Sequence, residues 1–292
     1  MCVELGGEIV ADLAVGKALI GSGTPLAHDS VMPLFSSAKP ITSVAIGALV
    51  DSGRLNFDDP VATHVPEFAT HGKSNIQVRH LMNHTSGLAD DALFDGGSSR
   101  AEVIAGICDS VPVPGWVPGD RAAYLPTAGW HMLGEVVERV SGSSFRSFRS
   151  FVQSFVLDPL RMGDTYPVVG PDLAERLGPR LAVMHNPRRQ PMTPDPQYLP
   201  DQLGRFVRPG SSFHGLAHDV VKLYSMLLRN GVSAEGERIL SGETVRMLTT
   251  RQHDGLLDET FGVVMDRGLG FLSTASGTVL RFPTGTDERY RT

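Results

Sequence analysis

The sequence predicts an α+β fold, in which helices flank an antiparallel sheet made from both chain ends and a mainly helical insert separates the two ends. Two observations lead to this prediction. Stretches with strand character lie near both ends, within residues 3–15 and 261–282, whereas helical spacing of apolar residues dominates the middle. We therefore expect a sheet domain formed by residues 1–60 and 255–292, and a helical domain formed by residues 61–254.

Composition narrows the classes of function. The chain has 292 residues, of which 41% are hydrophobic, so it can bury a large core. Its 26 Lys and Arg against 32 Asp and Glu, with no basic patch, argue against a nucleic-acid partner. Cys2 and Cys108 form no metal-binding or disulfide pattern, and no cofactor is predicted. We recognise neither a signal peptide nor a membrane-spanning run of about 18 apolar residues, so we expect a cytoplasmic protein.

The N-terminal part begins with two predicted strands, residues 3–5 and 8–15, joined by a turn at Gly6-Gly7. A loop is expected over residues 21–25. A further strand-like piece, residues 31–35, leads into a helix that is expected to end near Asp51, with Gly53 just beyond it.

Ser36 and Lys39 lie at the start of this helix. Residues three apart share one helix face, so both side chains can point into the same cleft. A lysine in a desolvated pocket can take the proton of a serine hydroxyl and make it a nucleophile. Ser-x-x-Lys is a weak motif by itself, because both residues are common. Pro40 leaves two alternatives open: a helix beginning near Ser36 keeps the pair together, and one beginning at Pro40 loosens it.

Helical spacing and turn residues organise the rest of the chain. Helices are expected over residues 78–83, 101–108, 127–140, 145–155 and 219–230, and from Ser241 onward. Residues 171–209, rich in Pro, Arg and Asp, are expected to form a long surface excursion. Strands alternating with turns are expected over residues 261–264, 269–272 and 278–282.

Several segments, taken together, resemble the beta-lactamase-related serine hydrolases, which include penicillin-binding proteins, class C lactamases, esterases and transesterases. Residues 35–40, Phe-Ser-Ser-Ala-Lys-Pro, look like the first motif of that family. Residues 78–88, Val-Arg-His-Leu-Met-Asn-His-Thr-Ser-Gly-Leu, look like a longer and more specific family segment. Residues 118–134, 157–165 and 209–231 resemble further family segments in the same order. The resemblance implies a beta-lactamase/transpeptidase-like fold.

The resemblance also implies a role for three side chains. Ser36 would attack the carbonyl of a small ester or amide, and its backbone N–H would be one oxyanion donor. Lys39 would accept or relay the serine proton. Tyr124 would share general base and acid duty and protonate the leaving group. The implied function is that of a serine hydrolase, esterase- or lactamase-like, which works through an acyl-enzyme.

Two motifs depart from the family pattern. Where the family often has Tyr-Ser-Asn, this chain has Tyr124-Leu125-Pro126, and the missing amide favours an ester over a lactam or peptide. The third motif, Lys/His-x-Gly, supplies a second oxyanion N–H, and its nearest match, Pro283-Thr284-Gly285, lacks the basic residue. One missing donor costs about 10²–10³ in turnover. An alternative hypothesis is therefore a truncated or degenerate homologue without catalysis.

Two other enzyme classes fit the sequence less well. The pairs His80/His84 and His214/His218 have a spacing that can place two metal ligands on one helix face. However, the sequence contains no His-Glu-x-x-His motif, and His84 falls inside a family-like segment. A hydrolase with a nucleophile elbow needs Gly-x-Ser-x-Gly, which the sequence does not contain.

Overall fold

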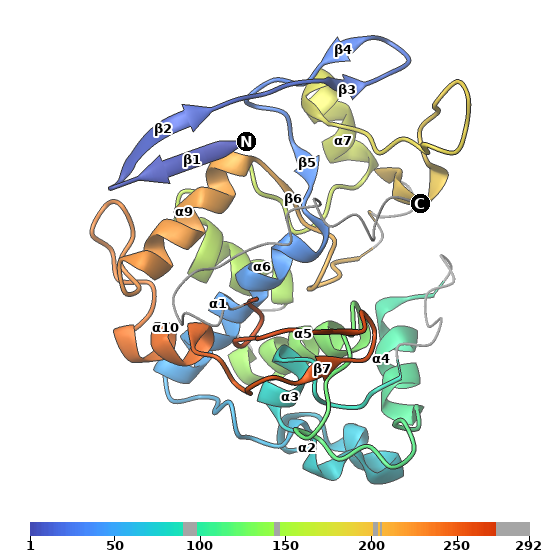
Figure 1. Cartoon of the computed structure of the whole chain (residues 1–292), viewed down its shortest axis with the longest axis vertical. Helices are drawn as coiled ribbons and strands as arrows, with labels where there is room; N and C mark the ends of the chain where they lie inside the picture. The colour runs from blue at the N-terminus through green and yellow to red at the C-terminus, as the bar shows by residue number, and fades with distance from the viewer. Residues whose placement is uncertain (90–97, 143–146, 201–203, 205, 273–292) are drawn as a thin grey trace.

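The structure, a computed structural model, describes residues 1–89, 98–142, 147–200, 204 and 206–272 (Figure 1). Its α-helices are α1 (Lys39–Asp51), α2 (Val61–His64), α3 (Val78–Met82), α4 (Arg100–Asp109), α5 (Ala128–Ser141), α6 (Phe148–Val152), α7 (Pro171–Leu177), α9 (Ala217–Leu228) and α10 (Gly242–Thr249). Its strands are β1 (Cys2–Leu5), β2 (Glu8–Asp12), β3 (Lys17–Leu19), β4 (Thr24–Pro25), β5 (Met32–Pro33), β6 (His214–Gly215), β7 (Leu257–Asp258) and β8 (Val263–Val264).

The described strands form two-stranded antiparallel sheets, β1-β2, β3-β4, β5-β6 and β7-β8. The first hairpin turns at Gly6 and Gly7, whose φ angles of 62° and 94° suit glycine, as the sequence predicted. Residues 21–25, predicted as a loop, include β4, which pairs with β3. The β5-β6 pair joins residues just before Ser36 to a segment a little more than 180 residues later, with Pro33 paired to His214, and so brings two distant parts of the chain to the same place.

Within the described residues, strands from the two chain ends do not pair with each other as the sequence analysis expected. The β7-β8 hairpin instead lies beside Ala122, which forms a parallel bridge with Asp258. In Figure 1 this hairpin lies with α3 and α5, whereas β1 and β2 lie over α9 at the other end of the molecule. The strand predicted over residues 278–282 lies outside the described residues.

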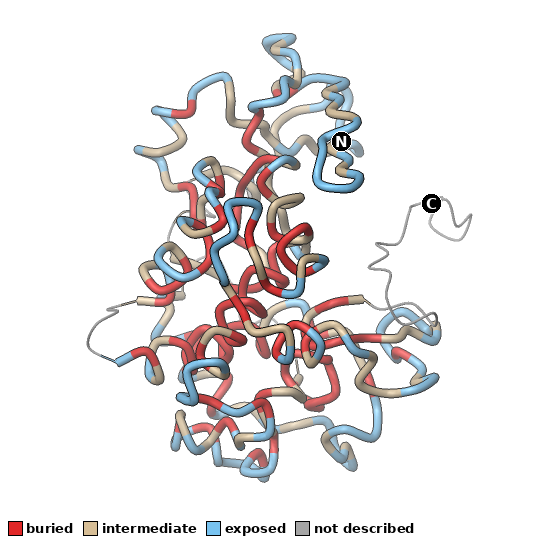
Figure 2. The backbone as a smooth tube through the Cα atoms, turned by 90° about the vertical axis from the view of Figure 1, so that its left-hand side faces the viewer, coloured by how far each residue is buried: buried red, intermediate tan, exposed pale blue. Residues whose placement is uncertain are grey.

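Helix α1 runs through the core. Every residue from Lys39 to Gly47 is buried, and α1 packs against α5, α6 and α10. A helix that is apolar on all sides is stable only inside a core, which explains this position. Figure 2 shows the buried backbone concentrated in the middle of the molecule, with exposed backbone at the hairpins and outer turns.

The start of α1 settles the two alternatives left by Pro40. Residues Phe35–Ala38 form a 3₁₀ turn, and the chain continues without a break into α1 at Lys39. Pro40 sits in the first turn of α1, where a missing N–H removes no helical hydrogen bond. Ser36 and Lys39 therefore stay together. The helix ends at Asp51, and Gly53 beyond it has a φ of 68°, as expected.

Most other helix predictions are confirmed to within about two residues at each end. The helix predicted over residues 145–155 is partly wrong, because α6 begins at Phe148 and continues as a π-helical turn from Gln153 to Leu157. The wider π turn shifts the buried face, so Val156 is buried and Phe155 is 40% exposed. Phe145, the first residue of this predicted helix, lies outside the described residues.

The surface excursion predicted over residues 171–209 contains more regular structure than expected. Pro171 starts α7, and a 3₁₀ turn spans Pro196–Tyr198. Leu177 of α7 packs with Val31, Val169 and Leu216 in a small second core. Apolar residues in a Pro- and Arg-rich stretch thus find partners that no local pattern reveals.

The division into a sheet domain and a helical domain stays a prediction. The main core runs across the expected boundary, since Phe57, Val61 and Val65 belong to one apolar cluster. A search of the described residues finds no helix with both the length and the apolar character needed to span a bilayer.

Candidate active site

The structure brings Ser36, Lys39 and Tyr124 together. The Ser36 Oγ lies 2.5 Å from the Tyr124 Oη and 3.1 Å from the Lys39 Nζ. Ser36 is exposed, whereas Lys39 is only 4% exposed. A reactant can therefore reach the hydroxyl while the lysine stays shielded from water.

Ser36 follows a residue with unusual backbone geometry. Phe35 has a φ of 46°, in the left-handed region that non-glycine residues rarely adopt. Its ring packs edge-on against Tyr198, with ring centroids 5.3 Å apart, and the preceding Leu34 N–H donates to the Phe213 carbonyl at 2.8 Å. Tertiary contacts thus hold a strained turn directly before the serine, an arrangement that is common at functional sites.

Lys39 is held by oxygens from three parts of the chain. Its Nζ donates to the Ser36 Oγ at 3.1 Å and to the carbonyls of Pro126 and Gly210, each at 3.2 Å. Three oxygens match the three N–H donors of an ammonium group. The Nζ also lies 5.2 Å from the ring centroids of Tyr124 and Trp130, within cation–π range.

The Pro209-Gly210 loop is part of this site, although the sequence analysis assigned it no role there. A Cβ at residue 210 would lie 2.8 Å from the Trp130 Cβ, so glycine allows the carbonyl to approach Lys39. Thr42 donates its hydroxyl to the Pro209 carbonyl at 2.6 Å and ties the loop to α1. The Pro-Gly pair was the available sequence signal, but its partner Lys39 is 171 positions away.

The Tyr124 ring contacts two other rings. The ring centroid lies 4.7 Å from that of His84 and 5.2 Å from that of Phe261. The backbone is tied as well: the Leu125 N–H donates to the His84 Nδ1 at 3.1 Å, and the Thr260 hydroxyl donates to the Tyr124 carbonyl at 3.2 Å. These contacts place the phenol oxygen beside Ser36.

His84 supports Tyr124 as a neutral side chain. Burial, together with the positive charges of Arg267 and Lys39, holds the pKa of His84 well below its ordinary value. Since Nδ1 accepts the hydrogen bond from Leu125, the ring proton sits on Nε2. From the sequence, His84 was a metal-ligand candidate inside a family-like segment, and its support of Tyr124 was missed.

Two other histidines of the metal hypothesis, His80 and His214, also have local hydrogen bonds. The His80 Nδ1 accepts from the Gln77 N–H at 3.1 Å and caps α3, and the His214 Nδ1 lies 2.9 Å from the Ser212 carbonyl oxygen. In the part of the chain that the structure describes, no three His, Cys, Asp or Glu side chains gather as metal ligands would.

The segment Gly268–Phe271 packs against α1 and the end of α3. Gly270 has a φ of 84° and donates its N–H to the Met82 carbonyl at 3.0 Å. A Cβ at this position would overlap the Ser43 Oγ on α1, so the close approach requires glycine. The segment Pro283-Thr284-Gly285, the nearest match to the third motif, lies outside the described residues.

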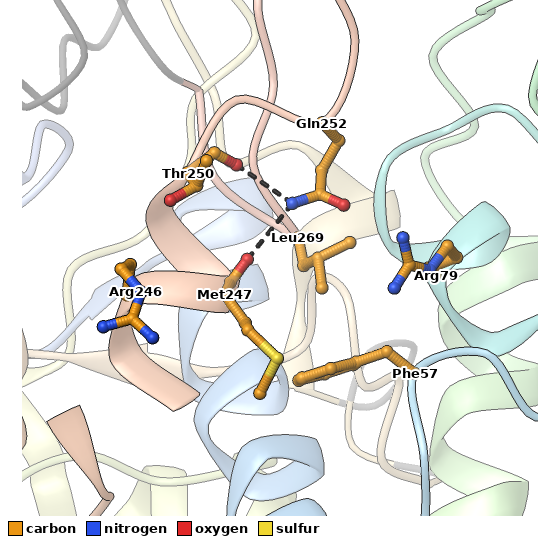
Figure 3. A pocket seen from close by; sticks show the side chains of 7 residues that line it. All are labelled: Phe57, Arg79, Arg246, Met247, Thr250, Gln252 and Leu269. Carbon is orange, nitrogen blue, oxygen red and sulfur yellow. Dashed lines mark hydrogen bonds between the residues drawn. The ribbon is translucent and has the colours of Figure 1, made fainter. Parts of the chain in front are cut away.

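A separate hollow of about 370 Å³ is lined by Phe57, Arg79, Arg246, Met247, Thr250, Gln252 and Leu269 (Figure 3). The Gln252 amide donates to the carbonyls of Met247 and Thr250, at 3.1 and 3.0 Å, so its orientation is set by the end of α10. None of the three clustered side chains lines this hollow, which is therefore distinct from the candidate active site.

Comparison with known proteins places the chain in a family. The family model described as Beta-lactamase matches residues 1–285. Protein Rv1367c of Mycobacterium tuberculosis (strain ATCC 25618 / H37Rv) is 29% identical over 272 residues, which cover 84% of this chain and 64% of that protein. Penicillin-binding protein 4 of Amycolatopsis lactamdurans is 30% identical over 251 residues, covering 85% and 63%. This chain thus spans somewhat less than two thirds of the length of these relatives.

Solved structures agree on the fold. A family VIII carboxylesterase superposes with a TM-score of 0.76 at 26% identity, covering 92% of this chain and 74% of that one. A penicillin-binding protein homologue from Caulobacter crescentus superposes with a TM-score of 0.75 at 22% identity, covering 93% and 74%. The predicted fold class, with helices and antiparallel strands in a beta-lactamase/transpeptidase-like arrangement, is confirmed. The chain belongs to the beta-lactamase family.

Proposed function

We propose that this protein is a serine hydrolase that cleaves small carboxylic esters through an acyl-enzyme on Ser36. The observation that carries the proposal is the cluster itself, in which the Ser36 Oγ lies 2.5 Å from the Tyr124 Oη and 3.1 Å from the Lys39 Nζ. A serine becomes a nucleophile when a base is within hydrogen-bond reach, and these distances satisfy that requirement.

The hydrogen bonds of Lys39 favour Tyr124 as the base. Three oxygens surround the Lys39 Nζ, and a neutral amine would have to give up one of these donor contacts to accept a proton. We therefore assign Lys39 as an ammonium that stabilises negative charge on the Ser36 and Tyr124 oxygens. The Lys39 ammonium and the Tyr124 phenol therefore titrate as one coupled unit.

Acylation follows from these roles. The Tyr124 phenolate takes the Ser36 proton while the Oγ attacks the ester carbonyl carbon. The carbonyl oxygen becomes an oxyanion that the Ser36 backbone N–H stabilises. As the C–O bond breaks, Tyr124 returns the proton to the departing alcohol. Water then attacks the acyl carbon while Tyr124 accepts its proton. As the bond between the acyl carbon and the Ser36 Oγ breaks, Tyr124 returns that proton to Ser36, and the carboxylic acid is released.

An ester is the favoured substrate because of the residues that follow Tyr124. Leu125 is buried, and the Pro126 carbonyl accepts from Lys39, so this segment offers no side-chain amide to hold an amide-bearing acyl group. The resemblance to Esterase EstB of Burkholderia gladioli, 31% identical over 176 residues that cover 54% of this chain and 44% of that protein, supports the same choice.

Activity-probe labelling tests the proposal. We expect a fluorophosphonate to form an adduct that mass spectrometry locates on Ser36, and Ser36→Ala to form none. Ser37→Ala is the matched control and should label at the wild-type rate. We further expect 4-nitrophenyl acetate to be turned over at least about tenfold faster than a chromogenic cephalosporin.

Folded wild-type protein that forms no Ser36 adduct would refute the proposal and favour a homologue without catalysis. Equal labelling of wild type and Ser36→Ala would show that another residue reacts. Faster turnover of the cephalosporin would overturn the choice of an ester.

A further inference from the structure

The turn between β7 and β8 docks on the segment that carries Tyr124. We call residues 258–263 the Phe261 turn. Its Glu259 N–H donates to the Ala122 carbonyl at 2.9 Å, and its Thr260 hydroxyl donates to the Tyr124 carbonyl at 3.2 Å. The turn therefore contacts the backbone of the Tyr124 segment as well as the Tyr124 ring.

Phe261 is the side chain that this turn presents. Its ring centroid lies 5.2 Å from that of Tyr124, with an interplanar angle of 38°, and the residue is 41% exposed. A single exposed phenylalanine is ordinary by itself. This one, however, leaves its free surface beside the phenol that protonates the leaving group in the proposed reaction.

A buried carboxylate holds the turn in shape. Asp258 is fully buried, and its Oδ1 accepts from the backbone N–H groups of Thr260 and Phe261, both at 3.0 Å. Its Oδ2 accepts from the guanidinium of Arg267, which is only 3% exposed. A buried ion pair repays its desolvation cost only when its geometry is good, and losing one partner leaves an uncompensated charge. The pair thus fixes the direction of the Phe261 backbone.

An exposed ion pair between Arg121 and Glu259 also attaches the Phe261 turn to the Tyr124 segment. Arg121 donates from Nε and Nη2 to the two carboxylate oxygens of Glu259, both at 2.7 Å. The Arg121 guanidinium lies 4.4 Å from the Trp116 ring centroid. The Phe261 turn is therefore tied to the Tyr124 segment by backbone, hydroxyl and side-chain contacts.

We propose that Phe261 determines specificity for the alcohol part of the ester, by forming an apolar wall beside Tyr124, and that Asp258 and Arg267 are positioning residues for this wall. The inference rests on the proposed function, since it places the departing alcohol oxygen at the Tyr124 phenol. The ring contact puts Phe261 next to the group attached to that oxygen. Esters of aromatic or bulky apolar alcohols should be preferred over esters of small alcohols.

Two ester series separate the alcohol side from the acyl side. The first keeps acetate as the acyl group and compares 2-naphthyl acetate with ethyl acetate. The second keeps the 4-nitrophenyl alcohol and compares acetate with butyrate. In Phe261→Ala we expect kcat/KM for 2-naphthyl acetate to fall about tenfold and that for ethyl acetate to change less than about threefold. Both 4-nitrophenyl esters should fall together, because they share an aromatic alcohol, so the ratio of acetate to butyrate turnover should stay unchanged.

The matched control is Phe155→Ala, since Phe155 is similarly exposed, at 40%, and stacks on Phe151 with ring centroids 4.5 Å apart. It should leave the selectivity ratio between the naphthyl and ethyl esters unchanged. Phe261→Leu, which keeps an apolar side chain, should restore part of that ratio.

The positioning role of Asp258 and Arg267 is tested by the selectivity ratio between the naphthyl and ethyl esters. Asp258→Asn keeps a carbonyl oxygen for the turn but removes the charge that Arg267 faces. We expect it to lower the selectivity ratio as Phe261→Ala does, whereas a purely structural loss would lower turnover of both esters equally. Thr260→Val, which removes one hydroxyl without disturbing the buried pair, should shift the ratio in the same direction by a smaller factor.

The outcomes separate the two proposals. Absence of a Ser36 adduct in folded wild type would overturn the proposed function, and this inference with it. A wild type that labels on Ser36, with a selectivity ratio that Phe261→Ala leaves unchanged, would overturn the inference alone. A changed ratio of acetate to butyrate turnover, with an unchanged ratio between the naphthyl and ethyl esters, would assign Phe261 to the acyl side and refute the inference as stated.

Discussion

Ser36 lies in the 3₁₀ turn before α1, and Lys39 is the first residue of α1, whereas Tyr124 reaches the same point from a segment 88 residues after Ser36. We call the side of the cluster that carries Ser36 and Lys39 the first wall, and the side that carries Tyr124 the second wall. The first wall rests on one buried helix, in which residues 39–47 are all buried. The second wall is an irregular segment, in which the Tyr124 ring contacts the rings of His84 and Phe261.

The difference shows two ways of placing a reactive group. Helical geometry sets the spacing of the first wall locally, so substitutions there remove functional atoms without moving the backbone. The second wall depends on contacts between parts that are distant in sequence, so changes around it alter geometry. Substitutions in the two walls, and in the loop between them, test this contrast.

Removing the ammonium from the first wall should have the largest effect. In Lys39→Met we expect the rate of fluorophosphonate labelling of Ser36 to fall by about 10³, because the charge beside the reacting oxygens is lost. The carbonyls of Pro126 and Gly210 also lose a donor, so the free energy of unfolding should fall by about 1–3 kcal/mol. Lys17→Met, at an exposed position on β3, is the control. A labelling rate within a few-fold of wild type would break the assignment of Lys39.

Removing the Tyr124 hydroxyl from the second wall should have the second largest effect on activity. Tyr124→Phe keeps the ring contacts but deletes the proposed base, so ester turnover should fall about 10²–10³-fold with little change in Tm. Tyr166→Phe, which deletes a hydroxyl that donates to Asp164 at 3.1 Å, should keep wild-type turnover. Equal turnover by Tyr124→Phe and wild type would transfer the role of base to Lys39.

Crowding the loop between the two walls should have an intermediate effect. In Gly210→Ala the new Cβ would lie 2.8 Å from the Trp130 Cβ and push the carbonyl away from Lys39. We expect about a tenfold loss of kcat/KM and a loss of about 1–3 kcal/mol in unfolding free energy. Gly163→Ala, where no atom lies within 4 Å of the added Cβ, should change neither quantity. Unchanged kinetics in Gly210→Ala would mean that this carbonyl does not position Lys39.

A titration in the core should affect stability alone. Burial and the charges of Arg208 and Arg100 lower the pKa of His131 to about 3. The unfolded state takes up a proton near the ordinary pKa of about 6.5, whereas the folded state stays neutral. Stability from this group is therefore present above about pH 6.5 and falls as the pH drops toward 3, by up to about 1.4 kcal/mol per pH unit.

Thermal unfolding between pH 7 and pH 4 checks this expectation. The Tm of wild type should fall more steeply with decreasing pH than that of His131→Gln. The His28→Gln variant, whose side chain is 61% exposed, should follow wild type. Parallel curves for wild type and His131→Gln would show that His131 is protonated in the folded state as well.

The sequence by itself determined the features that depend on local spacing. Ser36 and Lys39 could be paired because helix geometry relates residues three apart, and Gly53 could be placed beyond α1 because a left-handed residue commonly ends a helix. The order of the family-like segments predicted the fold class that the structural neighbours confirm. The choice of Tyr124 came from resemblance rather than from spacing.

Tertiary structure decided everything that depends on contacts between distant residues. The 3₁₀ turn before Lys39 resolved the ambiguity at Pro40, and packing around Tyr124 turned His84 from a metal-ligand candidate into a support for the phenol. Phe261, which the sequence analysis saw only as part of a predicted strand, lies in a turn beside Tyr124. Local periodicity reports which face of an element is apolar. It cannot report which distant element covers that face, because packing and buried charge settle that choice only in the folded chain.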